Sequence, residues 1–207
     1  MLSLPDVENL FASMEIPTKY AKPAYDIISG DENSVEAVRT FTPCMDKIPM
    51  DCAGMGLLPL FIKPAMENIQ IFKAFLGEVT PNTHTQETRI VLLDFLNSIA
   101  VKSANGHYIG ELHSSLIEIA YNDDAPMLIR AKALRNFPTD PQLIFTDFPY
   151  LGALDLALRS GNLMFCDAAA CLVCRLQELL HEMPNVEIPG YRYIKGSSPY
   201  RVGKKVG

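Results

Sequence analysis

The amino-acid sequence predicts an all-α protein. Leu, Ala and Met recur at spacings of three and four residues, alternating β-type runs are few, and proline or glycine marks the ends of most apolar segments. The apolar fraction of 48%, with 20% charged residues, is typical of a globular chain and argues against disorder. We expect stacked antiparallel helix pairs, with an irregular helical bundle as the alternative.

The first 80 residues predict short helices between frequent breaks. Ser3 or Leu4 starts the first, which ends at Pro17. A second runs from residue 18 or 19 to Ser29, with Gly30 as its stop, and a third begins at Asp31 and ends before Pro43. Residues 44–59 hold too many prolines and glycines for a long element, and one further helix is expected from about residue 60 or 64 to 76.

Residues 83–102 predict a central helix. Between Ile90 and Val101 only Asp94, Asn97 and Ser98 are polar, and at helical spacing they form one narrow stripe. Neighbouring elements must therefore cover the rest of the circumference. Thr83 or Thr85 can cap its first turn, and Glu87 interacts favourably with the helix dipole.

The second half of the chain has a nearly regular interval between helices. Helix starts are expected near Glu87, Pro126 and Leu163, which are 39 and 37 residues apart, with partner helices starting near Tyr108 and Pro149. In the helix at 126–137 the period turns Met127, Leu128, Ala131 and Leu134 inward, and the last helix runs from Leu163 to Met183 with Asn162 as its cap. This pattern predicts a series of helix pairs.

The interval resembles that of HEAT and armadillo repeats, whose units are about 40 residues of two or three helices. Proline-started first helices and the small-residue, basic-flanked segment Ile129–Arg135 carry the resemblance. It covers residues 85–183 and leaves 1–80 less regular. The resemblance implies a helical solenoid over residues 85–183. We expect a single helical domain, residues 1–189, followed by a basic tail at 190–207.

Composition also predicts where the protein resides. Residues 1–6 lack the basic start of a secretory signal, and the longest apolar run, 168–174, is far shorter than the roughly 20 residues of a membrane helix. Five cysteines in no disulfide-framework spacing suit free thiols in a reducing compartment. We therefore expect a soluble cytoplasmic or nuclear protein with no membrane association.

Three patterns could carry chemistry, and none of them assembles a site. Cys166, Cys171 and Cys174 have the spacing of a plant-type iron–sulfur motif, but alanines between them favour a helix that would point Cys166 and Cys171 about 140° apart. Small buried cysteines between helices are expected instead. Glu178 and His181 match half of a di-iron site without a second copy, and Cys52 has no adjacent base. We expect no metal, no cofactor and no enzymatic activity.

The C-terminal tail differs from the rest of the chain in charge. Residues 190–207 carry five cations and no acid, a charge of +5, whereas the remainder carries −11. Tyrosines alternate with these cations, a composition suited to an acidic protein groove or to stacked bases. The candidate contacts in the tail are Tyr191, Arg192, Tyr193, Lys195, Tyr200, Arg201, Lys204 and Lys205.

These features favour a non-enzymatic protein–protein interaction module or scaffold that holds a partner protein or peptide on a helical surface. Arg130, Lys132 and Arg135 join the tail residues as candidate partner contacts. The alternative is nucleic-acid binding through the basic tail, although the acidic body would repel nucleic acid. A solvated tail without a partner is a third interpretation. The partner and the oligomeric state do not follow from the sequence.

Overall fold

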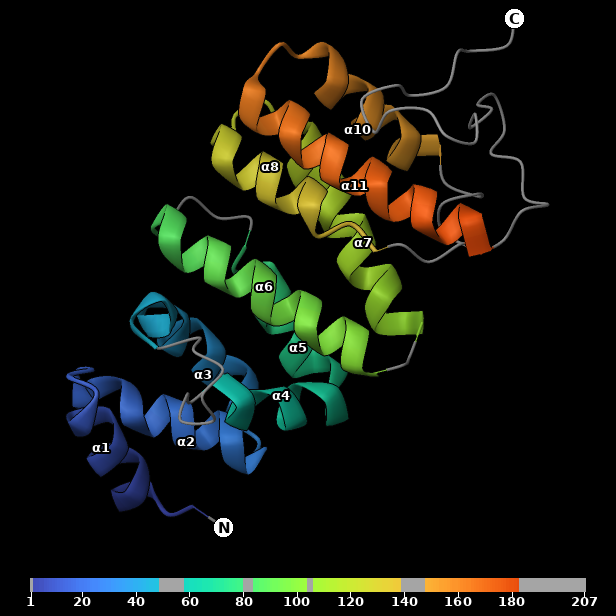
Figure 1. The fold of residues 1–207 in the computed structure, drawn as a ribbon. Helices are drawn as coiled ribbons and strands as arrows, with labels where there is room; N and C mark the ends of the chain where they lie inside the picture. The colour runs from blue at the N-terminus through green and yellow to red at the C-terminus, as the bar shows by residue number, and fades with distance from the viewer. Residues whose placement is uncertain (1, 49–57, 80–83, 104–105, 139–147, 183–207) are drawn as a thin grey trace, which may run out of the picture. The chain divides into compact units, whose positions relative to one another are not determined.

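The computed structural model describes residues 2–48, 58–79, 84–103, 106–138 and 148–182, and in these ranges every regular element is helical (Figure 1). The all-α prediction is therefore confirmed. The chain forms two compact units, Met1–Leu112 and His113–Gly207. Helix α7 supplies residues to both of them. None of the described helices is long and apolar enough to span a membrane.

The first unit is built from short helices that pack on their sequence neighbours. Helix α2 contacts α1, α3 and α4, while α3 contacts α5, and α6 contacts both α4 and α5. The elements are α1 (Leu4–Ser13), the 3₁₀ turn Thr18–Tyr20, α2 (Ala21–Ser29), α3 (Ser34–Phe41), the 3₁₀ turn Thr42–Lys47, α4 (Leu58–Glu67), α5 (Ile69–Gly77) and α6 (Gln86–Ser103), followed by the start of α7 (Gly106–Tyr121).

Local signals place several of these helix ends where the sequence predicted them. Ser3 forms a capping box with Asp6, and each side chain bonds the other residue's backbone N–H. Gly30 ends α2 in the left-handed conformation, at φ 69°. At α6 the Thr85 hydroxyl accepts the backbone N–H of Thr88, so Thr85 caps the central helix.

The single helix predicted up to residue 76 is wrong, because the structure has two helices there. Asn68 is extended, at φ −129° and ψ 105°, and interrupts the helical path. Its side chain accepts the backbone N–H of Gln70 and thereby caps α5. The side chain of an N-cap Asn accepts a backbone N–H of the first helical turn, which has no carbonyl partner within the helix. Asn68 therefore favours the start of a new helix.

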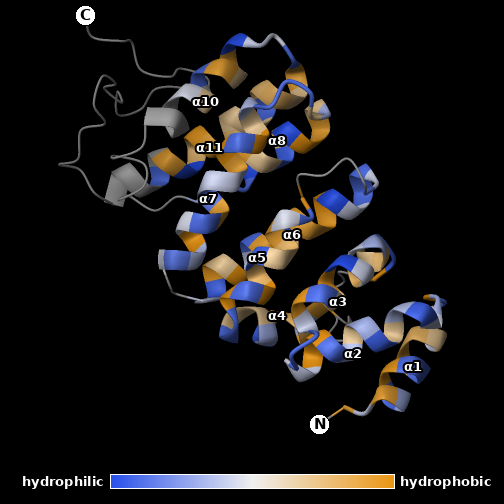
Figure 2. Cartoon of the chain, turned by 180° about the vertical axis from the view of Figure 1, so that it is seen from behind, coloured by the Kyte–Doolittle hydropathy of each residue, from blue (hydrophilic) through white to orange (hydrophobic). Residues whose placement is uncertain are grey.

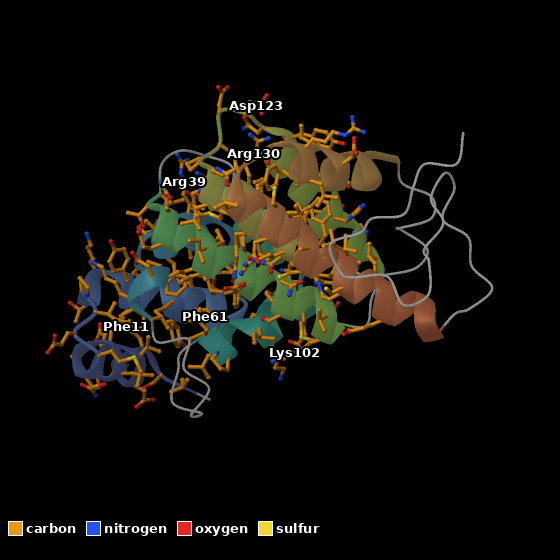
Figure 3. The ribbon with its side chains drawn as sticks, turned by 45° about the horizontal axis from the view of Figure 1, so that its top comes forward. Phe11, Arg39, Phe61, Lys102, Asp123 and Arg130 are labelled. Atoms are coloured by element: carbon orange, nitrogen blue, oxygen red, sulfur yellow. The ribbon has the colours of Figure 1, made fainter. Side chains whose placement is uncertain are left out.

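Aromatic side chains fill the core of the first unit around α6. Phe41 and Phe61 lie 4.5 Å apart between ring centroids, and Phe75 meets the edge of Phe95 of α6 at 5.0 Å. Hydrophobic residues line the inner sides of these helices, and Phe61 points into the packed interior (Figures 2 and 3). Most apolar positions of α6 are covered as predicted, except Val101, which is 71% exposed.

The second unit contains the remainder of α7 and three further described helices. They are α8 (Met127–Arg135), α10 (Phe148–Arg159) and α11 (Leu163–Glu182). Helix α11 lies beside α8 and also packs on α10 (Figure 1). Starts at residues 86, 127 and 163 agree with the predicted starts to within one residue. The predicted helical turn at 140–141 lies outside the described residues.

The same kind of hydrogen bond joins the two helices in each of three successive pairs. The fourth residue of the second helix donates to a carbonyl within two residues of the end of the first. Arg89 Nε donates to the Val79 carbonyl at 2.8 Å and Arg130 Nε to Ala120 at 3.0 Å. In the third pair, Cys166 Sγ lies 3.3 Å from the Ala157 carbonyl. Carbonyls at helix ends lack an i+4 donor, so the two arginines satisfy acceptors of that kind, whereas the Ala157 carbonyl also accepts from Ser160.

Candidate interaction surface

Two groups of candidate partner contacts came from the sequence, and the structure describes one of them. All eight tail candidates, from Tyr191 to Lys205, lie outside the described residues. The candidate helix cations Arg130, Lys132 and Arg135 all lie on α8 in the second unit. These three cations differ in their burial and in their contacts.

Arg130 is buried, with 6% of its surface exposed, and its contacts are internal. Besides the bond to the Ala120 carbonyl, its guanidinium pairs with Asp123 at 2.8 Å and stands 5.1 Å from the Phe165 ring centre. Figure 3 shows Arg130 pointing inward below the turn that carries Asp123. We name these four residues the Arg130 cluster. It joins α7, α8 and α11, which makes Arg130 a packing residue.

Lys132 and Arg135 are placed differently from Arg130. Lys132 is half-buried, whereas Arg135 is exposed and pairs with Asp167 of α11. Arg175, also of α11, donates to the Arg135 carbonyl at the end of α8. The two helices therefore share a charged surface, the α8–α11 face, made of Lys132, Arg135, Asp167 and Arg175.

Exposed apolar side chains gather around the Arg130 cluster. Of the seven large apolar side chains that are exposed among the described residues, five belong to the second unit. In the sequence, each of the five is one or two residues from a member of the Arg130 cluster or from Ala157, whose carbonyl Cys166 contacts. We name this set the apolar rim: Tyr121 (40% exposed), Leu128 (38%), Leu156 (38%), Leu163 (87%) and Met164 (46%).

The contacts of the second unit place the rim at one end of it. Arg130 over Phe165 joins the first turns of α8 and α11, which carry Leu128 on one helix and Leu163 and Met164 on the other. Cys166 against the Ala157 carbonyl joins α11 to the last turns of α10, next to Leu156. Tyr121 follows Ala120 at the end of α7, beside the same guanidinium. The rim is thus a surface made by four helix ends.

Sequence reasoning missed this surface, and its placement of Leu128 in the core was wrong. The helical period was correct for Ala131 and Leu134, which are buried, but Ile129 is buried in place of Leu128. Arg130 also points inward, where its guanidinium contacts a carbonyl, a carboxylate and an aromatic ring. One signal was available: Leu163 and Met164 directly follow the cap Asn162, where a first-turn side chain has few neighbours.

The cysteines of the third pair lie on one continuous helix, as the sequence predicted. Cys166 and Cys174 are partly buried, whereas Cys171 is exposed, so the expectation of buried thiols was wrong at Cys171. Within the ranges the structure describes, no group of three metal-ligating side chains assembles. In the first unit, burial raises the pKa of the Cys44 thiol to about 12. Cys52 lies outside the described residues.

Comparison of the chain with family models, curated proteins and solved structures found no match.

Proposed function

We propose that this protein is a protein–protein interaction module that acts by binding rather than by catalysis. The supporting observation is the apolar rim, where five large side chains of one unit are exposed around an internally bonded cluster. Contiguous exposed apolar surface rimmed by polar groups is typical of interaction sites. A partner would cover the rim and contact the α8–α11 face beside it.

The charged residues fit this role as a border around the contact. Arg135 and Asp167 are 48% and 60% exposed, so their pairing contributes little to stability and leaves both side chains able to meet a partner. An apolar centre with a polar border is the usual anatomy of a protein interface. The basic tail, with Tyr191, Tyr193 and Tyr200, would add further contacts.

The repeated helix-pair bond also supports a scaffold. Arg89 and Arg130 each reach back ten residues to a carbonyl. Helix pairs at a near-regular interval build extended binding surfaces in repeat proteins. We extend the proposal to a HEAT- or armadillo-like unit in the cytosol or nucleus, where an exposed thiol such as Cys171 stays reduced.

Affinity purification from the native source tests the proposal. The bait would be the intact chain, a chain lacking residues 190–207, and the variant Leu163→Ser/Met164→Ser. We expect a protein that the intact chain retains and the double variant loses, with a direct dissociation constant measured afterwards on purified components. Equal retention of every protein by the intact chain and the double variant would contradict the proposal.

Nucleic-acid binding remains the alternative, supported by the five cations of residues 190–207. It predicts that RNA or DNA binds the full chain with steep salt dependence and that binding disappears when the tail is removed. Electrophoretic mobility shift at low salt distinguishes the two functions. A shift that persists in the Leu163→Ser/Met164→Ser variant would favour this alternative.

A further inference from the structure

The apolar rim lies beside exposed acidic side chains, which restricts the chemistry of what can cover it. The turn between α7 and α8 carries Asp123, whose side chain is 89% exposed, and the exposed Asp124. Leu128 follows four residues after Asp124. Whatever buries Leu128 must therefore pass close to these two carboxylates.

Two cations near the rim, Arg130 and Arg159, have carboxylate partners within the chain. Arg130 is buried in its cluster, and Arg159 pairs with Asp155 at 2.9 Å. Residues 113–182 as a whole carry nine acidic and five basic side chains. A partner with acidic groups would meet repulsion at the 123–124 turn, whereas a partner with cations would be attracted.

We propose that the rim binds a basic amphipathic segment of another protein, with apolar residues against Leu128, Leu163 and Met164 and lysines or arginines toward Asp123 and Asp124. This inference rests on the proposed function and specifies its partner. An amphipathic helix suits the site, since its apolar residues recur every three or four positions and can cover a surface made of helix ends. Asp123 would then have two cations near it, Arg130 inside and one from the partner.

Two synthetic helical peptides of 18 residues test the charge preference. Both carry the same leucine face, and the polar face is lysine in one and glutamate in the other. We expect the full chain at physiological salt to bind the lysine peptide at least about tenfold more tightly, measured by fluorescence anisotropy. Equal binding of both peptides, or tighter binding of the glutamate peptide, overturns the inference.

Matched variants locate the binding. Leu163→Ser/Met164→Ser should weaken the lysine peptide about tenfold or more, because it removes apolar contact. Val101→Ser, a change at an exposed apolar residue of the first unit, should leave binding within about twofold. Asp124→Asn should weaken the lysine peptide and spare the glutamate peptide. If Val101→Ser and the double variant behave alike, the rim is not the site.

Two other occupants would replace the proposed one. A dimer of the intact chain that becomes a monomer in Leu163→Ser/Met164→Ser, by sedimentation, would show that a second copy covers the rim. A rise of about tenfold in peptide affinity after removal of residues 190–207 would show that the chain's own tail covers it. Either result would overturn the inference of a basic partner segment, but the rim would still be a binding surface. A native partner that needs the rim but lacks cations would do the same.

Discussion

Arg130 joins three segments of the second unit through one buried side chain. Its Nε satisfies the Ala120 carbonyl, a further nitrogen holds Asp123, and the guanidinium covers the Phe165 ring. A buried charge is costly unless it is bonded on several sides, and here it is. Truncating it leaves a buried acceptor without its donor, so the residue controls the shape of the surface around it.

Arg130→Met should therefore lower the free energy of unfolding by about 2–4 kcal/mol, since methionine fills the volume without donating a hydrogen bond. Urea denaturation followed by circular dichroism measures the loss. Arg159→Met is the control, because Arg159 is 77% exposed and pairs with Asp155 along its own helix, so the change should stay within about 0.5 kcal/mol. Equal effects at both positions would contradict the packing role given to Arg130.

Cys44 makes the stability of the first unit sensitive to alkaline pH. Burial raises its thiol pKa from 9.0 to about 12, so the folded state holds the proton more tightly than the unfolded state. This contribution is complete below about pH 9 and is lost as the pH rises from 9 toward 12. Stability should fall by roughly 1 kcal/mol between pH 8 and 10 from this group.

Urea denaturation at pH 8, 9 and 10 checks the Cys44 prediction. Cys44→Ala should be less stable at pH 8, because the residue is fully buried, and should also show a shallower fall toward pH 10. A variant with the same slope as the intact chain would rule out Cys44 as the source. The exposed Cys171 is the matched substitution, and Cys171→Ala should leave the slope unchanged.

At the scale of elements, helix packing depends on close approach between helices as well as on the arginine bonds within the pairs. Gly152 of α10 lies directly against the hydroxyl of Tyr121 at the end of α7, so a Cβ there would collide with that oxygen. Gly110 of α7 is also helical, but a Cβ at that position meets open space. The same glycine-to-alanine change therefore tests packing at one position and helix propensity at the other.

Gly152→Ala forces the Tyr121 hydroxyl to move, and because that oxygen ends a side chain that is 40% exposed, the loss of stability should be at most about 1 kcal/mol. Gly110→Ala should be neutral or stabilising by up to about 1 kcal/mol, because alanine favours the helix. Tyr121→Phe removes the colliding oxygen and should recover part of the loss in the double variant. Thermal unfolding of the intact chain, Gly152→Ala, Tyr121→Phe and their double variant gives the coupling free energy between residues 121 and 152. A coupling near zero would show that the Tyr121 hydroxyl does not oppose a side chain at position 152.

Helix class and helix starts followed from the sequence because they depend on local signals. Gly30, Thr85 and Asn162 act through their own backbone neighbours, so each could be identified without knowledge of the fold. The break at Asn68 was missed because Pro64 was read as a possible start, although it lies inside α4. Caps and breaks compete locally, and tertiary packing decides between them.

The apolar rim could not be predicted, since it depends on contacts between residues far apart in the chain. Arg130 is buried and Leu128 is exposed, the reverse of what the sequence predicted for these two residues. The three partners of Arg130 come from residues 120, 123 and 165, and the last of these is 35 positions away. No local pattern contains that information.

At the scale of the whole molecule, the single-domain prediction for residues 1–189 can be tested through α6. Leu93 is fully buried, and Leu93→Ala should cost about 2–5 kcal/mol. If residues 1–189 unfold as one domain, amide hydrogen exchange should quicken in both Met1–Leu112 and His113–Gly207. Faster exchange confined to the first unit would show two domains that unfold independently.

The central claim is that a partner protein covers the end of the second unit. Amide hydrogen exchange of the intact chain, with and without the purified partner, tests this most directly. The account predicts slower exchange in the first turns of α8 and α11, around residues 127–131 and 163–168, with little change in α1 to α3. Protection confined to the first unit, with the α8 and α11 turns unchanged, would contradict the claim.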